Sequence, residues 1–282
     1  MADVKGTAAG DLLTGTTLQD LIQGLGGDDV IHGDDGGDDL QGGAGNDSIF
    51  GGIGNDLISG GSGNDSIFDG AGDDVVNGGS GNDYVTAGVG GNDTYVGGSD
   101  VDTIDYSGAS AGLTVDLSKK SVSGDGADVV RGFENFVGST FSDTIKGSSS
   151  AEAIDGGAGK DVIRGLGGAD VLTGGDGADR FVWKTSDVVD ALGNSLGVDV
   201  IKDFQNNDTL DFRGMLPADA YSRMDELVHL VDTADGTMVQ VSVGATFVDV
   251  VLLEGVHTGG ALASNWASDS LILPSTEPPL LA

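Results

Sequence analysis

The sequence predicts an all-β repeat protein in which short strands alternate with glycine-rich turns. A nine-residue unit recurs through most of the chain up to Val182; between residues 42 and 86 its copies are GGAGNDSIF, GGIGNDLIS, GGSGNDSIF, DGAGDDVVN and GGSGNDYVT. Aspartate occupies position six of each copy and an aliphatic residue occupies position eight. The stretch from Gly6 to Ser118 contains 20 aspartates but no lysine or arginine. The period, the fixed phase and the missing basic residues together favour a solenoid that binds cations.

The phase is constant over nine consecutive units. The aspartates at position six are Asp11, Asp20, Asp29, Asp38, Asp47, Asp56, Asp65, Asp74 and Asp83. The aliphatic residues at position eight are Leu13, Ile22, Ile31, Leu40, Ile49, Ile58, Ile67, Val76 and Val85. Because side chains alternate between the faces of a strand, each unit predicts a strand of about three residues with one apolar side chain inside. The glycines allow tight turns that expose backbone carbonyls.

Carbonyl oxygens combined with short carboxylates favour calcium, which binds oxygen ligands almost exclusively. Without cations, the density of negative charge in this stretch would be self-repulsive. Only five of the 46 acidic residues are glutamates, so the bidentate glutamate that ends an EF-hand loop is missing. A flexible acidic linker would not keep an aspartate and an aliphatic residue in fixed phase, so we reject that alternative.

The composition limits the class of protein and its partners. The length of 282 residues allows two domains. A net charge of −34 excludes nucleic acid and anionic membranes as favourable partners. The chain has no cysteine, and no apolar run approaches the roughly 18 residues of a membrane span. Its first residues lack the charged and apolar regions of a cleaved secretory signal.

The repeat resembles the G-G-x-G-x-D-x-U-x nonapeptide of RTX proteins, in which U is an aliphatic residue. The resemblance implies a right-handed parallel β-roll in which consecutive repeats form opposite sides. One coil would then contain two of the nine-residue repeats. With coils about 4.8 Å apart, the eleven repeats of the first array would form a rod of about 26 Å.

The resemblance also implies a set of Ca²⁺ ligands, with each ion held between loops two repeats apart. One loop supplies the carbonyls of positions two and four and the aspartate, and the next loop supplies the carbonyls of positions one and three and its own aspartate. The ions would bind to the following residues: Gly27, Asp29, Asp34, Gly36, Asp38, Gly42, Gly43, Ala44, Gly45, Asp47, Gly51, Gly52, Ile53, Gly54, Asp56, Gly60, Gly61, Ser62, Gly63, Asp65, Asp69, Ala71, Asp74, Gly78, Ser80, Asp83, Gly157, Gly159, Asp161, Gly165, Gly167, Asp170, Gly174, Asp176 and Asp179.

The first array, residues 1–105, is irregular at both ends. Its two opening repeats, GTAAGDLLT and GTTLQDLIQ, have lost some of the consensus glycines and are expected to form a capping turn with weak or absent metal sites. Residues 87–96 form a ten-residue unit that moves the aspartate to Asp93, and the next unit restores the phase with Asp102 and Ile104.

Three further regions follow. Residues 106–137 interrupt the repeat and contain an alternating segment, Leu113 to Leu117, which predicts a strand in an insert against the roll. Residues 138–182 form a second array, whose first two repeats are glycine-poor. Residues 183–282, which contain every proline, are expected to form a mixed, mainly β capping region with a helix over 217–231 and a turn at Asp235–Gly236.

Residues 183–282 also resemble the segment that ends the roll in type I-secreted RTX proteins. The resemblance lies in FVWKTSDV followed by GVDVIKDFQNNDTLDFRGM. It implies a secretion target recognised by the type I machinery. Asp199, Asp203, Asp208 and Asp211 could bind calcium there or could lie in a solvated loop; the sequence leaves both possibilities open.

Secreted lipases and proteases often carry RTX rolls, so a catalytic function is an alternative for this chain. The chain has no H-E-x-x-H, and its three histidines are far apart in sequence. The segment GNSLG at 193–197 matches G-x-S-x-G in letters but lacks the preceding strand and following helix of a nucleophile elbow. His32 at position nine is expected to be a surface residue. We therefore predict a non-catalytic chain.

The favoured hypothesis is a monomeric module for calcium-dependent folding and type I secretion. It would lie at the end of a large extracellular RTX protein of a Gram-negative bacterium, and an adhesin that acts in cell attachment and biofilms is the expected parent. The alternatives are a carbohydrate- or ice-binding module and the non-catalytic tail of a secreted enzyme.

Overall fold

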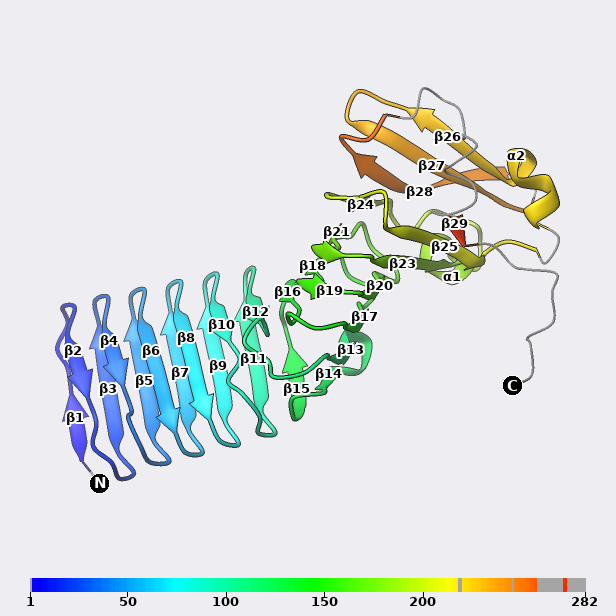
Figure 1. The fold of residues 1–282 in the computed structure, drawn as a ribbon. Coiled ribbons are helices and arrows are strands. Elements are labelled where there is room, and N and C mark those ends of the chain that lie inside the picture. Colours follow the sequence, from blue (N-terminus) through cyan, green and yellow to red (C-terminus); the bar gives the residue numbers. More distant parts are fainter. Residues whose placement is uncertain (1, 218–219, 245, 258–270, 273–282) are drawn as a thin grey trace, which may run out of the picture. The chain divides into compact units, whose positions relative to one another are not determined.

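The computed structural model describes residues 2–217, 220–244, 246–257 and 271–272. Strands and turns dominate these residues, and the helical segments among them are single turns. The chain divides into two compact units, residues 1–143 and 144–282. Figure 1 labels the elements along the chain.

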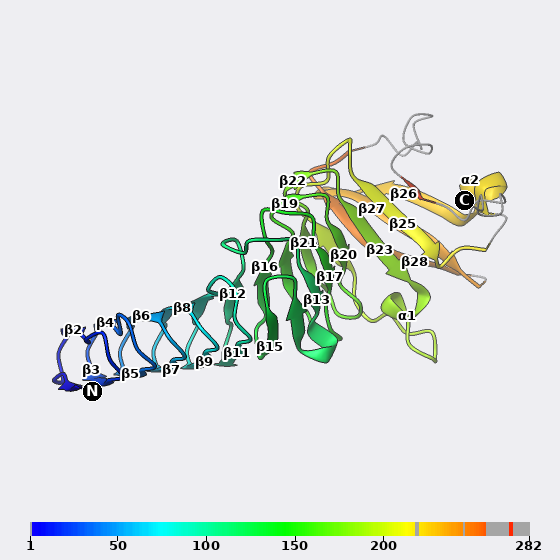
Figure 2. The same ribbon diagram turned by 60° about the horizontal axis from the view of Figure 1, so that its bottom comes forward.

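In the first unit the chain alternates between two sheets whose strands are parallel except at β13 to β15, and glycine-rich loops join one sheet to the other (Figures 1 and 2). Sheet one contains, in spatial order, β1 (Asp3–Lys5), β3 (Leu21–Gly26), β5 (Asp39–Ala44), β7 (Leu57–Ser62), β9 (Val75–Ser80), β11 (Thr94–Ser99), β15 (Ala127–Arg131), β14 (Ser121–Ser123) and β13 (Thr114–Asp116). Sheet two contains β2 (Leu12–Thr14), β4 (Val30–His32), β6 (Ser48–Ile53), β8 (Ser66–Ala71), β10 (Tyr84–Thr86), β12 (Thr103–Asp105) and β16 (Asn135–Val137).

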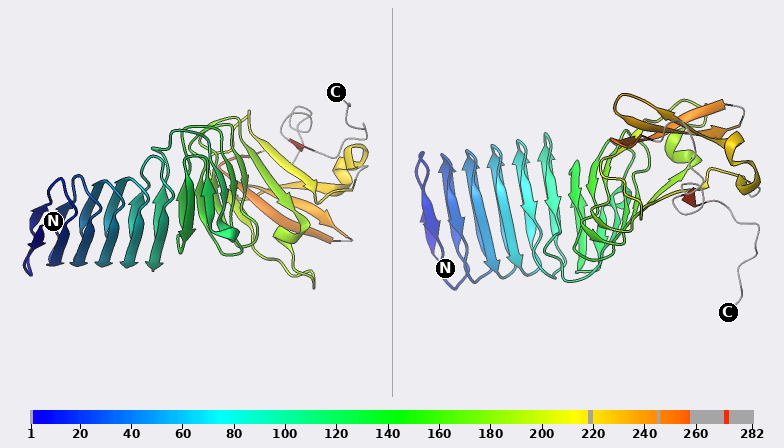
Figure 3. Two further views of the ribbon diagram at one scale, coloured as in Figure 1. Left: turned by 90° about the horizontal axis from the view of Figure 1, so that it is seen from below. Right: turned by 45° about the horizontal axis from the view of Figure 1, so that its top comes forward.

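The register between neighbouring strands gives the length of one coil. Leu21 pairs with Asp39, and Asp39 pairs with Leu57, so each step is exactly two repeats long. At the ten-residue unit the step is longer by one position, since Val75 pairs with Thr94. The predicted parallel roll with two repeats per coil and a one-residue slip is therefore confirmed. Figure 3 shows the parallel strands of the roll from two further directions.

The core of the first unit is a narrow double row of side chains from position eight. Its aliphatic members are 8% exposed or less: Leu13, Ile22, Ile31, Leu40, Ile49, Ile58, Ile67, Val76, Val85 and Ile104. Burial at every second residue along each strand satisfies the alternation seen in the sequence. Many strands are longer than the expected three residues. In β5 to β9 they have six, because positions one to three of the next repeat stay extended and pair with the neighbouring coil, as Gly43 does with Gly61.

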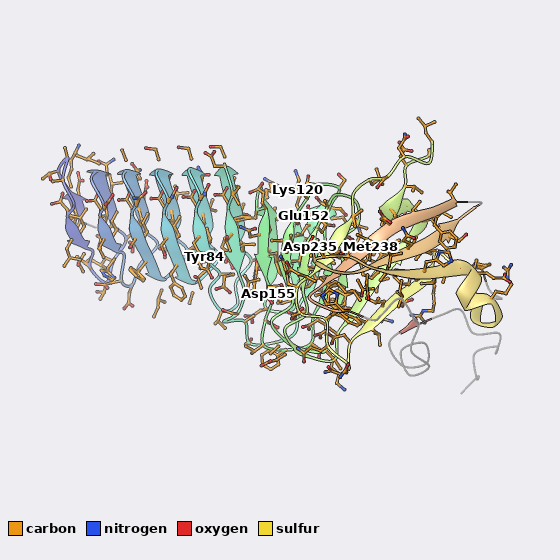
Figure 4. The ribbon with its side chains drawn as sticks, turned by 90° about the horizontal axis from the view of Figure 1, so that it is seen from above. Tyr84, Lys120, Glu152, Asp155, Asp235 and Met238 are labelled. Atoms are coloured by element: carbon orange, nitrogen blue, oxygen red, sulfur yellow. The ribbon has the colours of Figure 1, made fainter. Side chains whose placement is uncertain are left out.

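Residues 106–143 interrupt and then resume the roll. Strand β13 lies within the predicted Leu113–Leu117 segment and pairs antiparallel with β14, and β14 pairs antiparallel with β15. The turn between β13 and β14 contains the helical turn η1 (Leu117–Lys119) and the exposed Lys120, which Figure 4 labels. Strands β15 and β16 pair in parallel with β11 and β12, so the roll pattern resumes within the region expected to be an insert.

The second unit contains the same alternation. One set of neighbouring strands is β17 (Thr144–Lys146), β20 (Val162–Arg164), β23 (Arg180–Lys184), β25 (Thr209–Gly214) and β29 (Leu271–Ile272). The other is β18 (Ala153–Asp155), β21 (Val171–Thr173), β24 (Asp199–Ile201), β28 (Thr246–Glu254), β27 (Gly236–Val243) and β26 (Val228–Asp232). The short strands β19 (Ala158–Gly159) and β22 (Asp176–Gly177) pair separately. Its helical turns are α1 (Thr185–Val188), η2 (Ala220–Arg223) and α2 (Met224–Leu227).

The composition change at residue 182 does not end the parallel pairing. Arg180 in β23 pairs with Thr209 in β25, and Val171 pairs with Val200 in β24, so this step is much longer than two repeats. The added residues contain α1 and the loop after it. Residues 199–214 therefore continue the roll of this unit before the antiparallel strands β26 to β28 begin.

The predicted helix over 217–231 is wrong in its C-terminal part. Helical structure ends at Leu227, and β26 begins at Val228 and pairs antiparallel with β27. Val228 and Leu230 are buried, whereas Val231 is 43% exposed, a pattern that sheet pairing imposes on this segment. The predicted turn is confirmed, since the Thr233 N–H donates to the Gly236 carbonyl at 2.7 Å. The sequence also predicts a short helix over 261–267 and a loose tail from residue 274, and both lie outside the described residues.

Candidate metal sites

The position-six aspartates form a ladder that runs from coil to coil. The N–H of Asp47 donates to Oδ1 of Asp65 at 2.8 Å, and the N–H of Asp65 donates to Oδ1 of Asp83 at 2.9 Å. The same bond joins Asp29 to Asp47, Asp38 to Asp56, Asp56 to Asp74, Asp74 to Asp93, Asp83 to Asp102, Asp161 to Asp179 and Asp170 to Asp199. Each bond satisfies a backbone donor in the turn with one carboxylate oxygen.

The second carboxylate oxygen of most ladder aspartates is buried and accepts no hydrogen bond. Among the described residues this holds for Oδ2 of Asp29, Asp38, Asp47, Asp56, Asp65, Asp74, Asp83, Asp102, Asp170 and Asp179. These side chains are 3% exposed or less. A buried anionic oxygen with no donor is strongly disfavoured unless a cation or a proton neutralises it. The residues present therefore fit bound calcium, which would supply positive charge between neighbouring loops.

The glycines bring backbone carbonyls close to these oxygens. A Cβ on Gly42 would lie 2.3 Å from Oδ2 of Asp47 and 2.5 Å from the carbonyl oxygen of Gly60 in the next coil. A Cβ on Gly54, whose φ is +139°, would lie 1.3 Å from the carbonyl oxygen of Gly36. Any side chain at these positions would push the coils apart. The turns therefore concentrate oxygen atoms at both edges of the roll.

The loops that the sequence paired are neighbours in space. On one edge, residues 43–47 lie beside residues 60–65, and Ala44 pairs with Ser62. On the opposite edge, residues 52–56 lie beside 69–74, and Ile53 pairs with Ala71. In the second unit, residues 157–161 lie beside 174–179, and Ala158 pairs with Asp176. Equivalent positions in the flanking coils of the first unit are occupied by Gly27, Asp29, Asp34, Gly36, Asp38, Gly78, Ser80 and Asp83. Gly165, Gly167 and Asp170 belong to another turn of the second unit.

Burial dominates the electrostatics of the ladder. It raises the pKa of Asp65, Asp74 and Asp170 to about 7, although a backbone N–H bonded to each carboxylate opposes the shift. Neighbouring carboxylates also contribute to this rise in pKa. The metal-free roll therefore has a strong affinity for positive charge near neutral pH.

The glycine-poor repeats satisfy their carboxylates with hydroxyl groups instead. The N–H and the hydroxyl of Thr7 donate to Oδ2 of Asp11 at 2.6 and 2.9 Å. Thr16 binds Asp20 in the same way, and Ser139 binds Asp143 with both groups. Ser148 repeats the arrangement with Glu152, which Figure 4 labels. A threonine or serine at position two thus gives the turn a hydroxyl donor that the glycine repeats lack, so these repeats can close without calcium.

The last turns of the second unit are also satisfied by protein groups. The indole N–H of Trp183 donates to Oδ2 of Asp199 at 2.7 Å, and the N–H of Gln205 donates to Oδ2 of Asp208 at 2.7 Å. Asp203 accepts from the N–H groups of Gly174 and Gly175. Asp211 forms an ion pair with Arg213. The solvated-loop interpretation is wrong for Asp199, Asp208 and Asp211, which are 4%, 2% and 3% exposed. Calcium binding at these residues stays a prediction.

Sequence reasoning missed two sets of ladder residues. Asp128 accepts from the Asp93 N–H and Glu134 accepts from the Asp102 N–H, so both occupy position six in the region taken as an insert. Their signal was an acidic residue two positions before buried Val130 and Phe136. The second set is an amide ladder at position five, in which the N–H groups of Asn64 and Asn82 donate to the side-chain oxygens of Asn46 and Asn64.

The residues considered for catalysis lie on the surface. Ser195 is exposed in the turn after α1, and its hydroxyl bonds to the Gly197 carbonyl at 3.3 Å. A helical turn precedes it and strand β24 follows it, the reverse of a nucleophile elbow. His32 stacks on Phe50 on the outer face of sheet two, with ring centroids 4.8 Å apart. Within the described residues, no helix combines the length and apolar character that a membrane crossing requires.

These features define a class, the cation-binding β-rolls built from acidic nonapeptides. The family described as "RTX calcium-binding nonapeptide repeat (4 copies)" matches residues 5–40, 32–67, 59–91, 70–104, 131–163 and 155–182. The matched ranges cover more than half of the chain, which therefore belongs to the RTX repeat family.

Two solved structures are similar to parts of this chain. The extracellular lipase LipA from Serratia marcescens is 17% identical, with a TM-score of 0.26; the match covers 80% of this chain and 40% of the lipase. The AlgE6R3 subunit of the mannuronan C5-epimerase from Azotobacter vinelandii is 24% identical, with a TM-score of 0.21; the match covers 50% of this chain and 83% of that subunit. This chain thus spans less than half the length of the lipase. No curated protein matches it.

Substitution of a position-six aspartate should have different effects in the two kinds of turn: those in which its Oδ2 has no donor, and those in which a hydroxyl group donates to it. Asp65→Asn keeps an acceptor for the Asp47 N–H but removes the charge from the buried Oδ2. We expect it to raise the calcium midpoint of folding by about tenfold, because ligand charge tunes calcium affinity. The control Asp11→Asn alters a carboxylate already bound by Thr7 and should shift the midpoint little. Calcium titrations followed by circular dichroism measure both, and equal midpoints for Asp65→Asn and the parent would contradict the assigned ladder.

The raised pKa values also predict how pH acts on the metal-free chain. Folded Asp65 and Asp74 bind protons up to about pH 7, whereas the unfolded chain releases them near the ordinary value of 3.8. The folded state then holds more protons, so its stability falls as pH rises from about 4 to about 7. In EDTA, circular dichroism should show more β structure at pH 5 than at pH 8, and saturating calcium should remove the difference. More β structure at pH 8 in EDTA would contradict this prediction.

Proposed function

We propose that this chain is a calcium-dependent folding and secretion module of a large extracellular RTX protein. The single observation that carries the proposal is the row of buried, donor-free Oδ2 atoms in a stretch without lysine or arginine. Such a row is incompatible with a stable metal-free roll at neutral pH. Folding of the array and binding of cations are therefore one event.

The ligand assignment keeps the pattern of the family. Each ion would lie between adjacent coils, held by the carbonyls of positions two and four and the aspartate of one turn. The carbonyls of positions one and three and the aspartate of the next turn would complete the site. The ion supplies charge neutralisation when bound, and this chain's glycines hold the carbonyls of neighbouring turns in position. The turns of Asp47, Asp56, Asp65, Asp74 and Asp83 are the strongest sites on this basis.

Linkage between calcium and folding suits an exported protein. A ligand that binds only the folded state adds RT ln(1 + [L]/Kd) per site, or about 2.7 kcal/mol at a hundredfold excess. Calcium sites of extracellular modules have Kd values of roughly 10⁻⁴–10⁻³ M, so the roll would stay unfolded in the cytosol and fold outside. The hydroxyl-closed turns at Asp11 and Asp20 would cap the first array without an ion.

The remaining parts of the proposal concern export and the parent protein. The C-terminal region, residues 183–282, would carry the target for a type I exporter of a Gram-negative bacterium, as its resemblance to RTX termini suggests. A roll followed directly by this region, without a catalytic motif in the sequence, favours an adhesin that acts at the cell surface and in biofilms. The chain would be monomeric and have no nucleic-acid partner, consistent with its net charge of −34.

Circular dichroism of the full chain tests the folding proposal. In EDTA at neutral pH the chain should be largely unfolded, because the buried carboxylates repel one another. Addition of millimolar calcium should produce β structure, whereas the same ionic strength of sodium should not. Identical spectra with and without calcium would refute the proposal.

A truncation tests the secretion proposal. Removal of residues 183–282, the whole region proposed to carry the target, leaves residues 1–143 intact, so the first unit should bind calcium as in the parent. Export from a host with a type I exporter should be lost, because the expected target is removed. The intact chain, expressed at the same level, is the control. Export of the truncated chain at full yield would show that the target lies elsewhere.

A further inference from the structure

Two departures from the repeat lie one coil apart in the first unit. Asp69 occupies position one of its repeat, where the other four repeats between residues 42 and 86 have glycine. The ten-residue unit that contains Asp93 begins two repeats later, at Ala87. The two turns are neighbours, since the N–H of Asp74 donates to Oδ1 of Asp93 at 2.8 Å.

The extra residue opens the second of these turns. Gly88 lies over Gly70 and Gly91 lies over Gly72, because a Cβ on each would be within 2.0 Å of the carbonyl oxygen below. Val89 and Gly90 therefore occupy the space that one residue fills in the other coils. Val89 is 55% exposed, and a Cβ on Gly90 would meet no atom within 4 Å. In this fully described segment, pairing of β8 with β10 stops at Phe68 and Thr86.

The regular coil shows what the opened turn has lost. There β6 pairs with β8 through Ile53 and Ala71, which places the position-three backbone against the neighbouring turn. The extra residue at Val89–Gly90, called the bulge below, removes this pairing between Ala71 and the next coil. One main-chain oxygen of the usual ligand set is thus displaced from the site between residues 69–74 and 88–93.

The side chain of Asp69 fills the adjacent space. In the glycine repeats, a Cβ at position one would lie 2.3 Å from Oδ2 of the position-six aspartate, as for Gly60 and Asp65. The side chain of Asp69 accordingly starts beside Oδ2 of Asp74. Asp69, Asp74 and Asp93 each place a carboxylate oxygen so that all three oxygens lie within 4.8 Å of one another.

The hydrogen bonds leave this cluster short of positive charge. The Tyr95 hydroxyl lies 2.6 Å from Oδ2 of Asp69 and 3.2 Å from Oδ2 of Asp93, but its single proton can serve only one of them. Asp74 is 1% exposed, its Oδ1 accepts from the Asp56 N–H, and its Oδ2 has no donor. Three carboxylates therefore converge in a dry space, and no basic residue exists between Gly6 and Ser118.

We propose that the Asp69 carboxylate is a calcium ligand that replaces the carbonyl displaced by the bulge, completing a site with Asp74 and Asp93. This inference rests on the proposed function, since it concerns one ion of the calcium-folded roll. Three carboxylates give the site more negative charge than its neighbours, which have two, and a higher ligand charge favours tighter calcium binding. Tyr95 is a positioning residue that orients the Asp69 side chain from the core.

The test is to restore the repeat consensus with Asp69→Gly in the full chain. By the repeat pattern alone this change should be neutral or favourable, because glycine is the usual residue and every main-chain ligand remains. We expect instead that calorimetric titration with calcium will show one site of the highest-affinity class weakened by about tenfold or more, with the other sites unchanged.

Two further variants control for charge and for folding. Asp73→Asn removes an equal charge from the exposed neighbouring position, keeps the acceptor for the Asn92 N–H and should leave the titration unchanged. Asp69→Asn keeps the side-chain volume and the acceptor for the Gly88 N–H, so it decides the question if Asp69→Gly does not fold in calcium. Binding by these Asp69 variants that equals the parent's would overturn the inference alone, whereas a parent that binds no calcium would overturn the proposed function with it.

Discussion

The structure depends on how each turn treats the carboxylate at position six. One oxygen accepts the backbone N–H of the aspartate in the preceding coil, as Asp65 does for Asp47 at 2.8 Å, and this bond sets the stacking of the turns. The other oxygen is buried without a donor in the regular glycine repeats of the first unit, such as those of Asp47 and Asp65. Backbone geometry thus fixes an anion where neither water nor a basic side chain can neutralise it. The narrow core, one side chain per strand, offers little apolar burial to offset that cost.

In other turns, hydrogen bonds from protein groups satisfy this carboxylate, so these turns do not depend on a bound cation. Thr7, Thr16, Ser139 and Ser148 donate two hydrogen bonds each to the acidic side chain of their own repeat. In keeping with this, hydrogen bonds, first from the Ala2 N–H, hold the pKa of Asp20 below its ordinary value, whereas burial raises that of Asp65. Trp183 and Gln205 have a similar role in the second unit. Turns with a donor-free carboxylate therefore have, along the chain, neighbouring turns whose carboxylates are satisfied by the protein, which gives the array defined ends.

Irregularities within the roll are compensated locally. The one-residue slip at residues 87–96 lengthens the register by one position without disturbing the core, because Tyr95 replaces the aliphatic residue of that strand. The larger ring reaches the carboxylates of Asp69 and Asp93, so a core residue is hydrogen-bonded to the carboxylates at the edge of the roll in this coil. A repeat protein tolerates such variation because each coil contacts only its neighbours, and the correction need extend no further than one turn.

The sequence by itself determined the roll, its period and the aspartates of its regular turns. The reason is that, in a nine-residue repeat, only one phase of the strands buries the aliphatic residue. It also located the slip and the glycine-poor repeats. It did not reveal that Asp128 and Glu134 continue the ladder after the β13–β14 hairpin, or that β24 and β25 continue it after α1. It also extended a helix through Val228 to Val231, where pairing with β27 forms a strand. Strand pairing across insertions of unequal length decided these points, since the partners are up to 35 residues apart and no local pattern encodes that distance.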